Sequence, residues 1–281
     1  MEMRLILFEN LLSAVNKLTI LYSALILLAL AAVFSVLLAV LGRKLAIKQD
    51  DRIEKIEKKL SGANCGGCGY AGCSAFAKAL VEGRAELSAC NATPKANKDE
   101  IAEILGLSSS GEETKVVVCC CGGNDAVDKY DYMGYGDCRS MEMLAGGRKL
   151  CDWGCLGMGT CTDACPTHAI EVGQGGYALI KEDMCIKCGK CIGVCPKRLI
   201  ARIPKKAVVY IACKNCLKGK EVRNLCKKGC IGCGICAKQC PSGAITMVND
   251  LPVIDYEKCN GCKICAAKCP SKCIKICDEQ K

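Results

Sequence analysis

Two runs of cysteines near the C-terminus have a spacing that can do metal chemistry. They read Cys230-x2-Cys233-x2-Cys236-x3-Cys240-Pro241 and Cys259-x2-Cys262-x2-Cys265-x3-Cys269-Pro270. Four thiolates at this spacing can hold one [4Fe-4S] cluster, and in paired runs the fourth cysteine of each run binds the cluster of the other run. The spacing therefore predicts two clusters. Their ligands are Cys230, Cys233, Cys236 and Cys269 for one, and Cys259, Cys262, Cys265 and Cys240 for the other.

Zinc is the alternative metal, because Cys-x2-Cys pairs also suit a tetrahedral zinc site. Two triplets at x2-x2 spacing, each followed by Cys-Pro, favour iron instead.

A second pair of runs lies upstream. They read Cys151-x3-Cys155-x5-Cys161-x3-Cys165-Pro166 and Cys185-x2-Cys188-x2-Cys191-x3-Cys195-Pro196. The nearly equal separation of the two runs in each pair indicates an internal repeat of two ferredoxin-like units, residues 151–204 and 230–281. Ligand exchange then predicts two further clusters. Their ligands are Cys151, Cys155, Cys161 and Cys195 for one, and Cys185, Cys188, Cys191 and Cys165 for the other.

The repeat also identifies cysteine and histidine residues that are not expected to bind metal. After each Cys-Pro comes a tetrad, which reads THAI, KRLI, SGAI or SKCI. Cys273 takes the place that Ala169, Leu199 and Ala244 take in the other copies, so we interpret it as a packing residue. His168, the single histidine, is interpreted as a surface residue.

A different cysteine quartet stands closer to the N-terminus, in residues 62–93. It reads Cys65-x2-Cys68-x4-Cys73-x16-Cys90, and its glycines let the backbone curl around a metal site. A helix over 75–87 would bring Cys90 back to the other three. The pattern predicts a fifth [4Fe-4S] cluster, with a zinc knuckle as the alternative. Residues 94–115, which hold a short helix over 98–107 and the stretch SSSGEET, are predicted to be a linker.

The remaining cysteines suggest a sixth cluster. Cys119, Cys120, Cys121 and Cys138 lie in residues 116–150, a segment that is predicted to pack on the ferredoxin-like units. A β-like run over 115–118 leads into the three adjacent cysteines. Residues 205–229 connect the two ferredoxin-like units and contain Cys213, Cys216 and Cys226. Cys138, one of the three adjacent cysteines and two from the connecting segment could supply four ligands. Spacing alone does not choose among them.

The N-terminal segment, residues 1–42, predicts a membrane anchor. Residues 18–41 carry no charge and are long enough to span a bilayer as a helix. A cleaved signal peptide is disfavoured, because the apolar run is too long and lacks a small-residue cleavage site. Basic residues follow at once, so the positive-inside rule places the cysteine-rich part in the cytoplasm, where thiols stay reduced. Residues 43–61 are predicted to be a charged juxtamembrane helix, interpreted as a solvated spacer.

The composition supports a metal-filled interior. The chain has 281 residues, 29 cysteines, only 4% aromatic residues and a formal charge of +10. Each oxidised cluster with its four thiolates contributes a charge of about −2, which offsets much of the basic excess. A nucleic-acid binder is disfavoured, because no aromatic platforms alternate with the basic residues. The fold class that follows is α+β, with a single transmembrane helix, a small helical [4Fe-4S] domain and two tandem bacterial-ferredoxin-like units.

The combination of one span, ANCGGCGYAGC, a linker, CDWGCLGMGTCTDACP and CKKGCIGCGICAKQCP resembles a known family. It is similar to the B subunit of the Rnf complex, the ion-translocating ferredoxin:NAD oxidoreductase, in its long polyferredoxin form from anaerobes. The resemblance implies that the family's Cys-x-Gly pattern falls on Cys120 and Gly122, and its later cysteine pair on Cys213 and Cys226. It thereby suggests Cys120, Cys138, Cys213 and Cys226 as ligands of the sixth cluster.

The resemblance also implies a function. The chain would carry electrons from soluble reduced ferredoxin through about six [4Fe-4S] clusters to membrane partners, coupled to NAD reduction and Na+ or H+ translocation. Other Rnf subunits would be partners in the cytoplasmic membrane and would hold the flavin and nicotinamide sites. The chain shows no acid, base or nucleophile constellation, so it would break no bonds itself. A polyferredoxin subunit of another membrane hydrogenase or dehydrogenase is the alternative.

Overall fold

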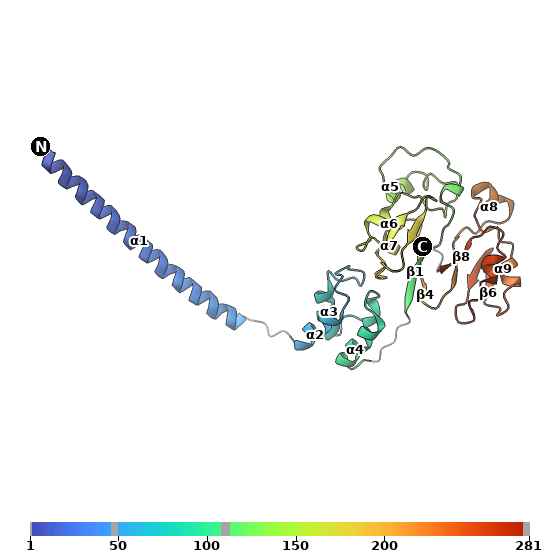
Figure 1. Cartoon of the computed structure of the whole chain (residues 1–281), viewed down its shortest axis with the longest axis horizontal. Coiled ribbons are helices and arrows are strands. Elements are labelled where there is room, and N and C mark those ends of the chain that lie inside the picture. Colours follow the sequence, from blue (N-terminus) through green and yellow to red (C-terminus); the bar gives the residue numbers. More distant parts are fainter. Residues whose placement is uncertain (1, 46–49, 108–112, 278–281) are drawn as a thin grey trace. The chain divides into compact units, whose positions relative to one another are not determined.

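The structure is a computed structural model that describes residues 2–45, 50–107 and 113–277 (Figure 1). The chain divides into two compact parts, Met1–Asp50 and Asp51–Lys281. The N-terminal part is the helix α1 (Glu2–Leu45). Within it, Leu21–Gly42 has a mean hydropathy of 3.0 and is the one helical stretch in the described residues that is long and apolar enough to cross a membrane. Its large apolar side chains are exposed, which suits a helix whose surroundings are lipid.

Asp51 begins a small helical domain that carries the first cysteine quartet. Its elements are the helices α2 (Asp51–Lys59), α3 (Cys73–Val81) and α4 (Lys95–Leu105) and the short 3-10 turn η1 (Leu87–Ala89). Glycines in the left-handed region, Gly83 at φ 69° and Gly106 at φ 68°, follow α3 and α4 and end them.

The helix α2 differs from the predicted solvated spacer. Ile56 is fully buried and Leu60 nearly so, and both pack against Phe76 of α3 and Ile101 of α4. The charged residues of α2 lie on its other face, so this short helix is amphipathic and completes the core of the domain. Residues 46–49 of the predicted juxtamembrane helix lie outside the described residues.

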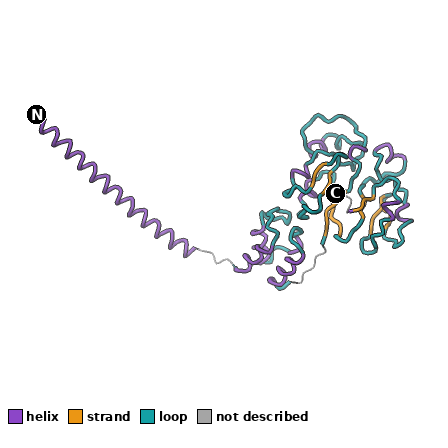
Figure 2. Tube along the Cα trace, in the orientation of Figure 1, coloured by secondary structure: helices purple, strands orange, loops and turns teal. Residues whose placement is uncertain are grey.

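Four two-stranded antiparallel sheets organise the described residues from 113 onward (Figure 2). In the first repeat, β1 (Thr114–Val118) pairs with β4 (Ile200–Pro204), and β2 (Ile170–Val172) pairs with β3 (Ala178–Ile180). In the second repeat, β5 (Val209–Ile211) pairs with β8 (Ile274–Ile276), and β6 (Ile245–Val248) pairs with β7 (Leu251–Ile254). Short helices connect them, namely α5 (Cys138–Met143), α6 (Thr160–Asp163), α7 (Lys190–Val194), α8 (Lys220–Leu225), α9 (Ile235–Lys238) and α10 (Ile264–Ala267), with the 3-10 turn η2 (Gly123–Asp125).

The strand pairing shows that the repeat is longer than the cysteine runs. Each repeat is a strand, two or more short helices, a hairpin, one further short helix and a returning strand that pairs with the first. The registers correspond, because Val118 pairs with Ile200 in one repeat and Ile211 with Ile274 in the other. One residue further on, the Cys119 amide donates to the Leu199 carbonyl at 2.7 Å, and the Ala212 amide donates to the Cys273 carbonyl, also at 2.7 Å. The strands β1 and β5, which precede the cysteine runs, therefore belong to the repeats through their pairing with β4 and β8.

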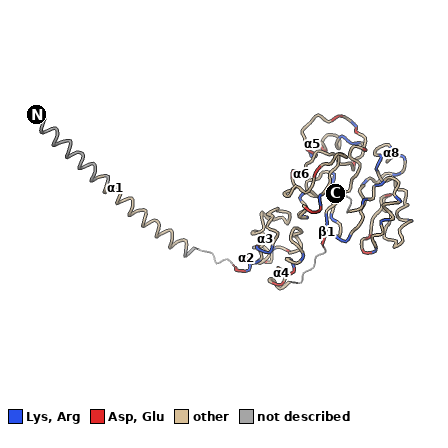
Figure 3. Tube along the Cα trace, in the orientation of Figure 1, with Lys and Arg blue, Asp and Glu red and all other residues tan. Residues whose placement is uncertain are grey.

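The interior of the two repeats contains few aromatic side chains. One buried cluster joins the repeats and includes Val117, Ile203 and Tyr210 together with several cysteines. The hairpin of each repeat packs on its own small aliphatic cluster. Charged residues of both signs are distributed over these repeats, whereas Leu21–Gly42 carries none (Figure 3). The ion pairs are mostly exposed and contribute little to stability.

Candidate iron–sulfur sites

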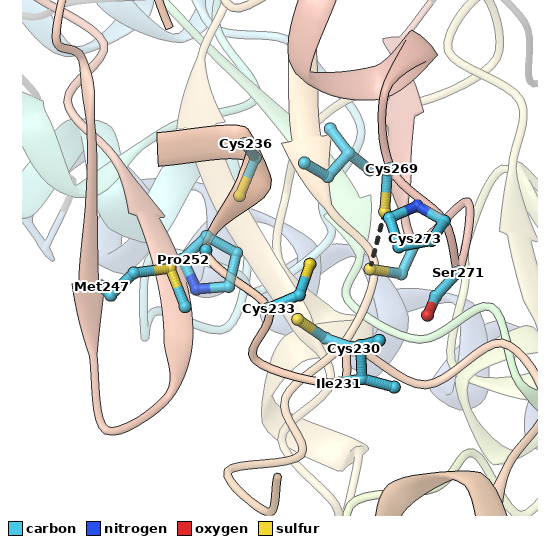
Figure 4. A pocket seen from close by; sticks show the side chains of 12 residues that line it. Cys230, Ile231, Cys233, Cys236, Met247, Pro252, Cys269, Ser271 and Cys273 are labelled. Carbon is cyan, nitrogen blue, oxygen red and sulfur yellow. Dashed lines mark hydrogen bonds between the residues drawn. The ribbon is translucent and has the colours of Figure 1, made fainter. Parts of the chain in front are cut away.

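The second repeat brings one predicted quartet around a single pocket. Cys230, Cys233, Cys236 and Cys269 line it, and Figure 4 shows their sulfurs together with Cys273. Gly232 at φ 64° and Gly234 at φ 69° hold the loop in a left-handed conformation that most side chains avoid. This curl turns three successive thiols inward, while Cys269 arrives from beyond α10 in the other run.

The other predicted quartet of this repeat is also close together. Burial raises the pKa of the Cys265 thiol. The further contributions that raise it come from three nearby cysteines, which are Cys259, Cys262 and Cys240. The exchange of fourth ligands that the paired runs predict is thus compatible with the geometry of both quartets.

In the first repeat, the second cysteine run behaves in the same way. Cys165, Cys185, Cys188 and Cys191 line one pocket. The amide of Ala169 donates to the Cys165 sulfur at 3.3 Å, and the amide of Leu199 donates to the Cys195 sulfur at 3.4 Å. Backbone donors to a sulfur stabilise negative charge on it, as a metal-binding thiolate requires.

The first cysteine run of this repeat differs from the predicted grouping. Its pocket is lined by Cys138, Cys155, Cys161 and Cys195, whereas the sequence grouped Cys151 with the last three. The segment CLGMGTC at 155–161 corresponds to CIGCGIC at 230–236, so Met158 stands where the second repeat has Cys233. Cys138 at the start of α5 supplies the missing thiol, and its amide donates to the Thr160 hydroxyl at 2.8 Å.

Cys151 belongs instead to a pocket between the two repeats. Cys120, Cys151, Cys213 and Cys226 line this pocket. Each repeat contributes two of these cysteines. Cys120 and Cys213 stand two residues after the first strand of their repeat, β1 or β5. Cys151 and Cys226 stand four residues before the first cysteine of the 155–161 or 230–236 loop. Relative to the predicted sixth site, Cys151 and Cys138 have therefore exchanged places, and an alignment of Cys151-x3-Cys155 with Cys226-x3-Cys230 would have indicated it.

Hydrogen bonds repeat the symmetry of this inter-repeat site. The Cys155 amide donates to the Cys120 sulfur at 3.4 Å, and the Cys230 amide donates to the Cys213 sulfur at 3.3 Å. The buried Asn215 donates its side-chain N–H to the Cys151 sulfur at 3.9 Å. On the opposite side, a Cβ on Gly122 would lie 2.8 Å from the Cys226 sulfur, so only glycine leaves room there.

Strand alternation selects Cys120 from the three adjacent cysteines. Val116 and Val118 face the core of the first repeat, while Val117 faces the cluster that joins the repeats. Cys119 and Cys121 continue on the side of Val117 and pack in that joining cluster. Since side chains alternate along an extended chain, Cys120 points the other way, into the inter-repeat pocket.

The small helical domain holds its quartet in one pocket. Cys65, Cys68, Cys73 and Cys90 all line it. The Asn64 side chain accepts a hydrogen bond from the Cys73 amide at 2.8 Å, which stabilises the first turn of α3. A Cβ on Gly72 would lie 2.9 Å from that Asn64 oxygen, so the glycine leaves space for the contact. The Cys90 sulfur lies 3.2 Å from the hydroxyl of the buried Thr93.

These thiols suit a buried cationic centre. Burial raises the pKa of Cys151 to about 11 and those of Cys155 and Cys213 to about 12, so a bound cation is needed to hold them as thiolates. In the described residues, no three His, Cys, Asp or Glu side chains converge closely enough to hold one metal ion, so the sulfurs surround pockets instead of a point. The four cysteines around each pocket and the backbone donors to their sulfurs fit iron–sulfur clusters.

Three comparisons with family models agree with these sites. Residues 60–92 match the family described as a putative Fe-S cluster, residues 151–206 match the LdpA Fe-S cluster-binding domain, and residues 229–279 match the 4Fe-4S dicluster domain. The fold and the cysteine sites thus define an iron–sulfur protein with several clusters, preceded by an apolar N-terminal helix.

Similar proteins identify the particular family. The chain is 37% identical over 257 residues to the B subunit of the ion-translocating oxidoreductase complex of Methanosarcina acetivorans, covering 91% of this chain and 94% of the relative. It is 38% identical over 228 residues to the B subunit of the Na(+)-translocating ferredoxin:NAD(+) oxidoreductase complex of Acetobacterium woodii, covering 80% and 68%. A proton-translocating counterpart in Clostridium ljungdahlii is 36% identical over 84% of both chains. The chain belongs to the family of B subunits of the Rnf ion-translocating oxidoreductase complexes, which confirms the predicted resemblance.

Proposed function

We propose that this chain is the membrane-anchored electron-transfer subunit of an Rnf complex. It takes electrons from reduced ferredoxin and passes them to membrane partners, coupled to NAD reduction and to Na+ or H+ translocation. The names of the relatives support this proposal, since one names Na+ and another protons as the translocated ion. The chain itself breaks no covalent bonds.

We assign six [4Fe-4S] clusters to the cysteine quartets. The ligand sets are Cys65, Cys68, Cys73 and Cys90; Cys138, Cys155, Cys161 and Cys195; Cys165, Cys185, Cys188 and Cys191; Cys120, Cys151, Cys213 and Cys226; Cys230, Cys233, Cys236 and Cys269; and Cys240, Cys259, Cys262 and Cys265. Each cluster, when bound, accepts and releases one electron at a low potential.

The observation that carries the proposal is the inter-repeat quartet. It contains two cysteines from each repeat, and its sulfurs accept hydrogen bonds from Cys155 and Cys230. The side chains of Cys155 and Cys230 line the pockets on either side. These two residues therefore touch neighbouring sites at once, which supports a continuous electron route through both repeats.

The metal assignment is tested on the anaerobically purified full chain. We expect a brown protein with broad visible absorbance and about 24 irons, that is, four for each of about six clusters. Acid-labile sulfide should equal iron. A correctly folded, colourless chain with stoichiometric zinc would overturn the assignment.

The direction of transfer is a separate proposal. The terminal repeat receives the electrons, and the Cys65–Cys90 site, nearest along the chain to the apolar helix, releases them. In the intact complex, Cys68→Ala should leave the other clusters reducible by ferredoxin yet stop NAD reduction. Continued NAD reduction at the rate of the unaltered complex would show that the exit lies elsewhere.

The orientation in the membrane is proposed from charge. Leu21–Gly42 spans the bilayer and the cysteine-rich part lies in the cytoplasm, because basic residues crowd the end of the span that leads to it. Protease added to right-side-out vesicles should leave the cysteine-rich part intact, and protease added to inverted vesicles should remove it. The reverse pattern would contradict this orientation.

A further inference from the structure

Cys273 is a buried thiol that belongs to none of the six quartets. Its side chain is 1% exposed and lines the same pocket as Cys230, Cys233, Cys236 and Cys269. Its sulfur lies 3.6 Å from the sulfur of Cys269, and Figure 4 marks this contact with a dashed line. Cys273 therefore lies beside a sulfur that faces the pocket.

The other copies of the repeat show that a thiol is not needed here for packing. Leu199 takes the corresponding place in the first repeat, and it is equally buried at 1%. Ala169 and Ala244 take it after the other two Cys-Pro pairs, and both are also buried. An apolar side chain thus fills this position in three of the four copies.

In these copies, the residue four positions after the cysteine of Cys-Pro donates its backbone amide to that cysteine's sulfur. A side-chain thiol at that position is particular to Cys273. In the first repeat, the amide of Leu199 donates to the Cys195 sulfur at 3.4 Å, and no side-chain donor can come from a leucine. In the second repeat, the Cys273 sulfur lies 3.6 Å from the Cys269 sulfur, and either thiol could donate in this contact. Once Cys269 binds iron as a thiolate, only Cys273 still has an S–H group to donate.

A thiol donor affects a cluster ligand in a known direction. The S–H group is a weak donor, and a sulfur that carries negative charge is its natural acceptor. Reduction adds one negative charge to a cluster, so a hydrogen bond to a ligand sulfur stabilises the reduced form more than the oxidised form and raises the potential.

We propose that Cys273 donates an S–H hydrogen bond to the Cys269 sulfur and thereby raises the midpoint potential of the cluster held by Cys230, Cys233, Cys236 and Cys269. The inference rests on the proposed ligand assignment. Cys273 is a positioning and tuning residue, because it acts through Cys269 and does not bind iron. The matching cluster of the first repeat, with Leu199 in this place, then has the lower potential of the two.

The test compares Cys273→Leu and Cys273→Ser with the unaltered full chain, purified anaerobically. Iron and sulfide are measured first, and each protein is then titrated in a redox cell with the reduced clusters followed by EPR. We expect the Leu variant to keep its iron. The ratio of reduced to oxidised cluster at a fixed potential should fall by a factor of about three to ten for one cluster, the size of one weak hydrogen bond. That factor corresponds to about 30 to 60 mV for one electron.

The Ser variant keeps a donor and should titrate closer to the unaltered chain than the Leu variant does. The reverse exchange, Leu199→Cys, introduces the donor in the first repeat and should raise the potential of the cluster held there. This gain does not depend on whether the Cys273 variants fold.

Several outcomes would overturn the inference. One is a Leu variant with full iron whose titration superimposes on that of the unaltered chain. Another is a loss of about four irons in both Cys273 variants, because Cys273 would then be a ligand of one [4Fe-4S] cluster. A Leu199→Cys variant with an unchanged or lower potential would also contradict it. An unaltered chain without iron would instead overturn the ligand assignment on which the inference rests.

Discussion

The exchange of Cys138 and Cys151 yields a rescue experiment. Met158 stands in the loop position that Cys233 takes in the second repeat, and the two loops share their backbone conformation. Gly157 at φ 74° and Gly159 at φ 80° correspond to the two left-handed glycines of the 230–236 loop. A thiol placed at 158 would therefore point where the Cys233 thiol points. Cys138→Ala should lose one cluster, and the additional change Met158→Cys should restore it.

The size of the effect follows from how the quartets are built. Cys138 lines one pocket, and no cysteine is shared between quartets. Cys138→Ala should therefore lower the iron content by about one sixth, from about 24 to about 20 per chain. The double variant should return to about 24. Met158 packs beside the small core of Cys138, Met141 and Leu156, so its shorter replacement fits without displacing backbone.

Cys151 provides the matched control, because the sequence grouped it with the same three cysteines. Cys151→Ala should also lose about four irons of one [4Fe-4S] cluster, but from the inter-repeat site, which Met158→Cys cannot reach. The assay is iron and sulfide content together with the EPR spectrum of the reduced protein. If Met158→Cys rescued Cys151→Ala and left Cys138→Ala unrepaired, the grouping read from the structure would be refuted.

Two further predictions concern the inter-repeat site. Gly122→Ala would place a Cβ 2.8 Å from the Cys226 sulfur and should cost this cluster its iron, whereas Gly136→Ala, where an added Cβ meets nothing within 4 Å, should leave iron unchanged. Full iron with an unaltered EPR spectrum in Gly122→Ala would count against the assigned ligands. Asn215→Asp replaces the N–H group 3.9 Å from the Cys151 sulfur by a negatively charged oxygen, so redox titration should show a lower midpoint potential for one cluster. An unchanged or higher midpoint would show that Asn215 does not act on that sulfur.

The grouping of the cysteines in the regular runs could be predicted without a structure, because it depends on residues that are close together in the sequence. Within Cys230-x2-Cys233-x2-Cys236, the two intervening glycines favour the left-handed curl that turns three thiols inward. The contribution of Cys269 from the partner run follows from the pairing pattern. The family could likewise be recognised, since motif, linker and span occur in one order along the chain.

The irregular sites depended on tertiary contacts. Cys138 reaches its pocket from α5, which is separated from the other three cysteines by a long segment. No fixed cysteine spacing therefore links Cys138 to them in the sequence. Cys120 was open among three candidates until the register of β1 with β4 determined which side chains face the joining cluster. The burial of Ile56 was also missed, because a short charged helix looks solvated until its partner helices are in place.

The sequence by itself indicated an iron–sulfur protein with several clusters and the family to which it belongs, because cysteine type and close spacing are properties of a few consecutive residues. The tertiary structure decided which distant cysteines line one pocket. Two repeats must pair their strands before Cys120 and Cys213, or Cys151 and Cys226, can face one pocket. Such a site is created by the packing of the repeats, and no stretch of the sequence contains it.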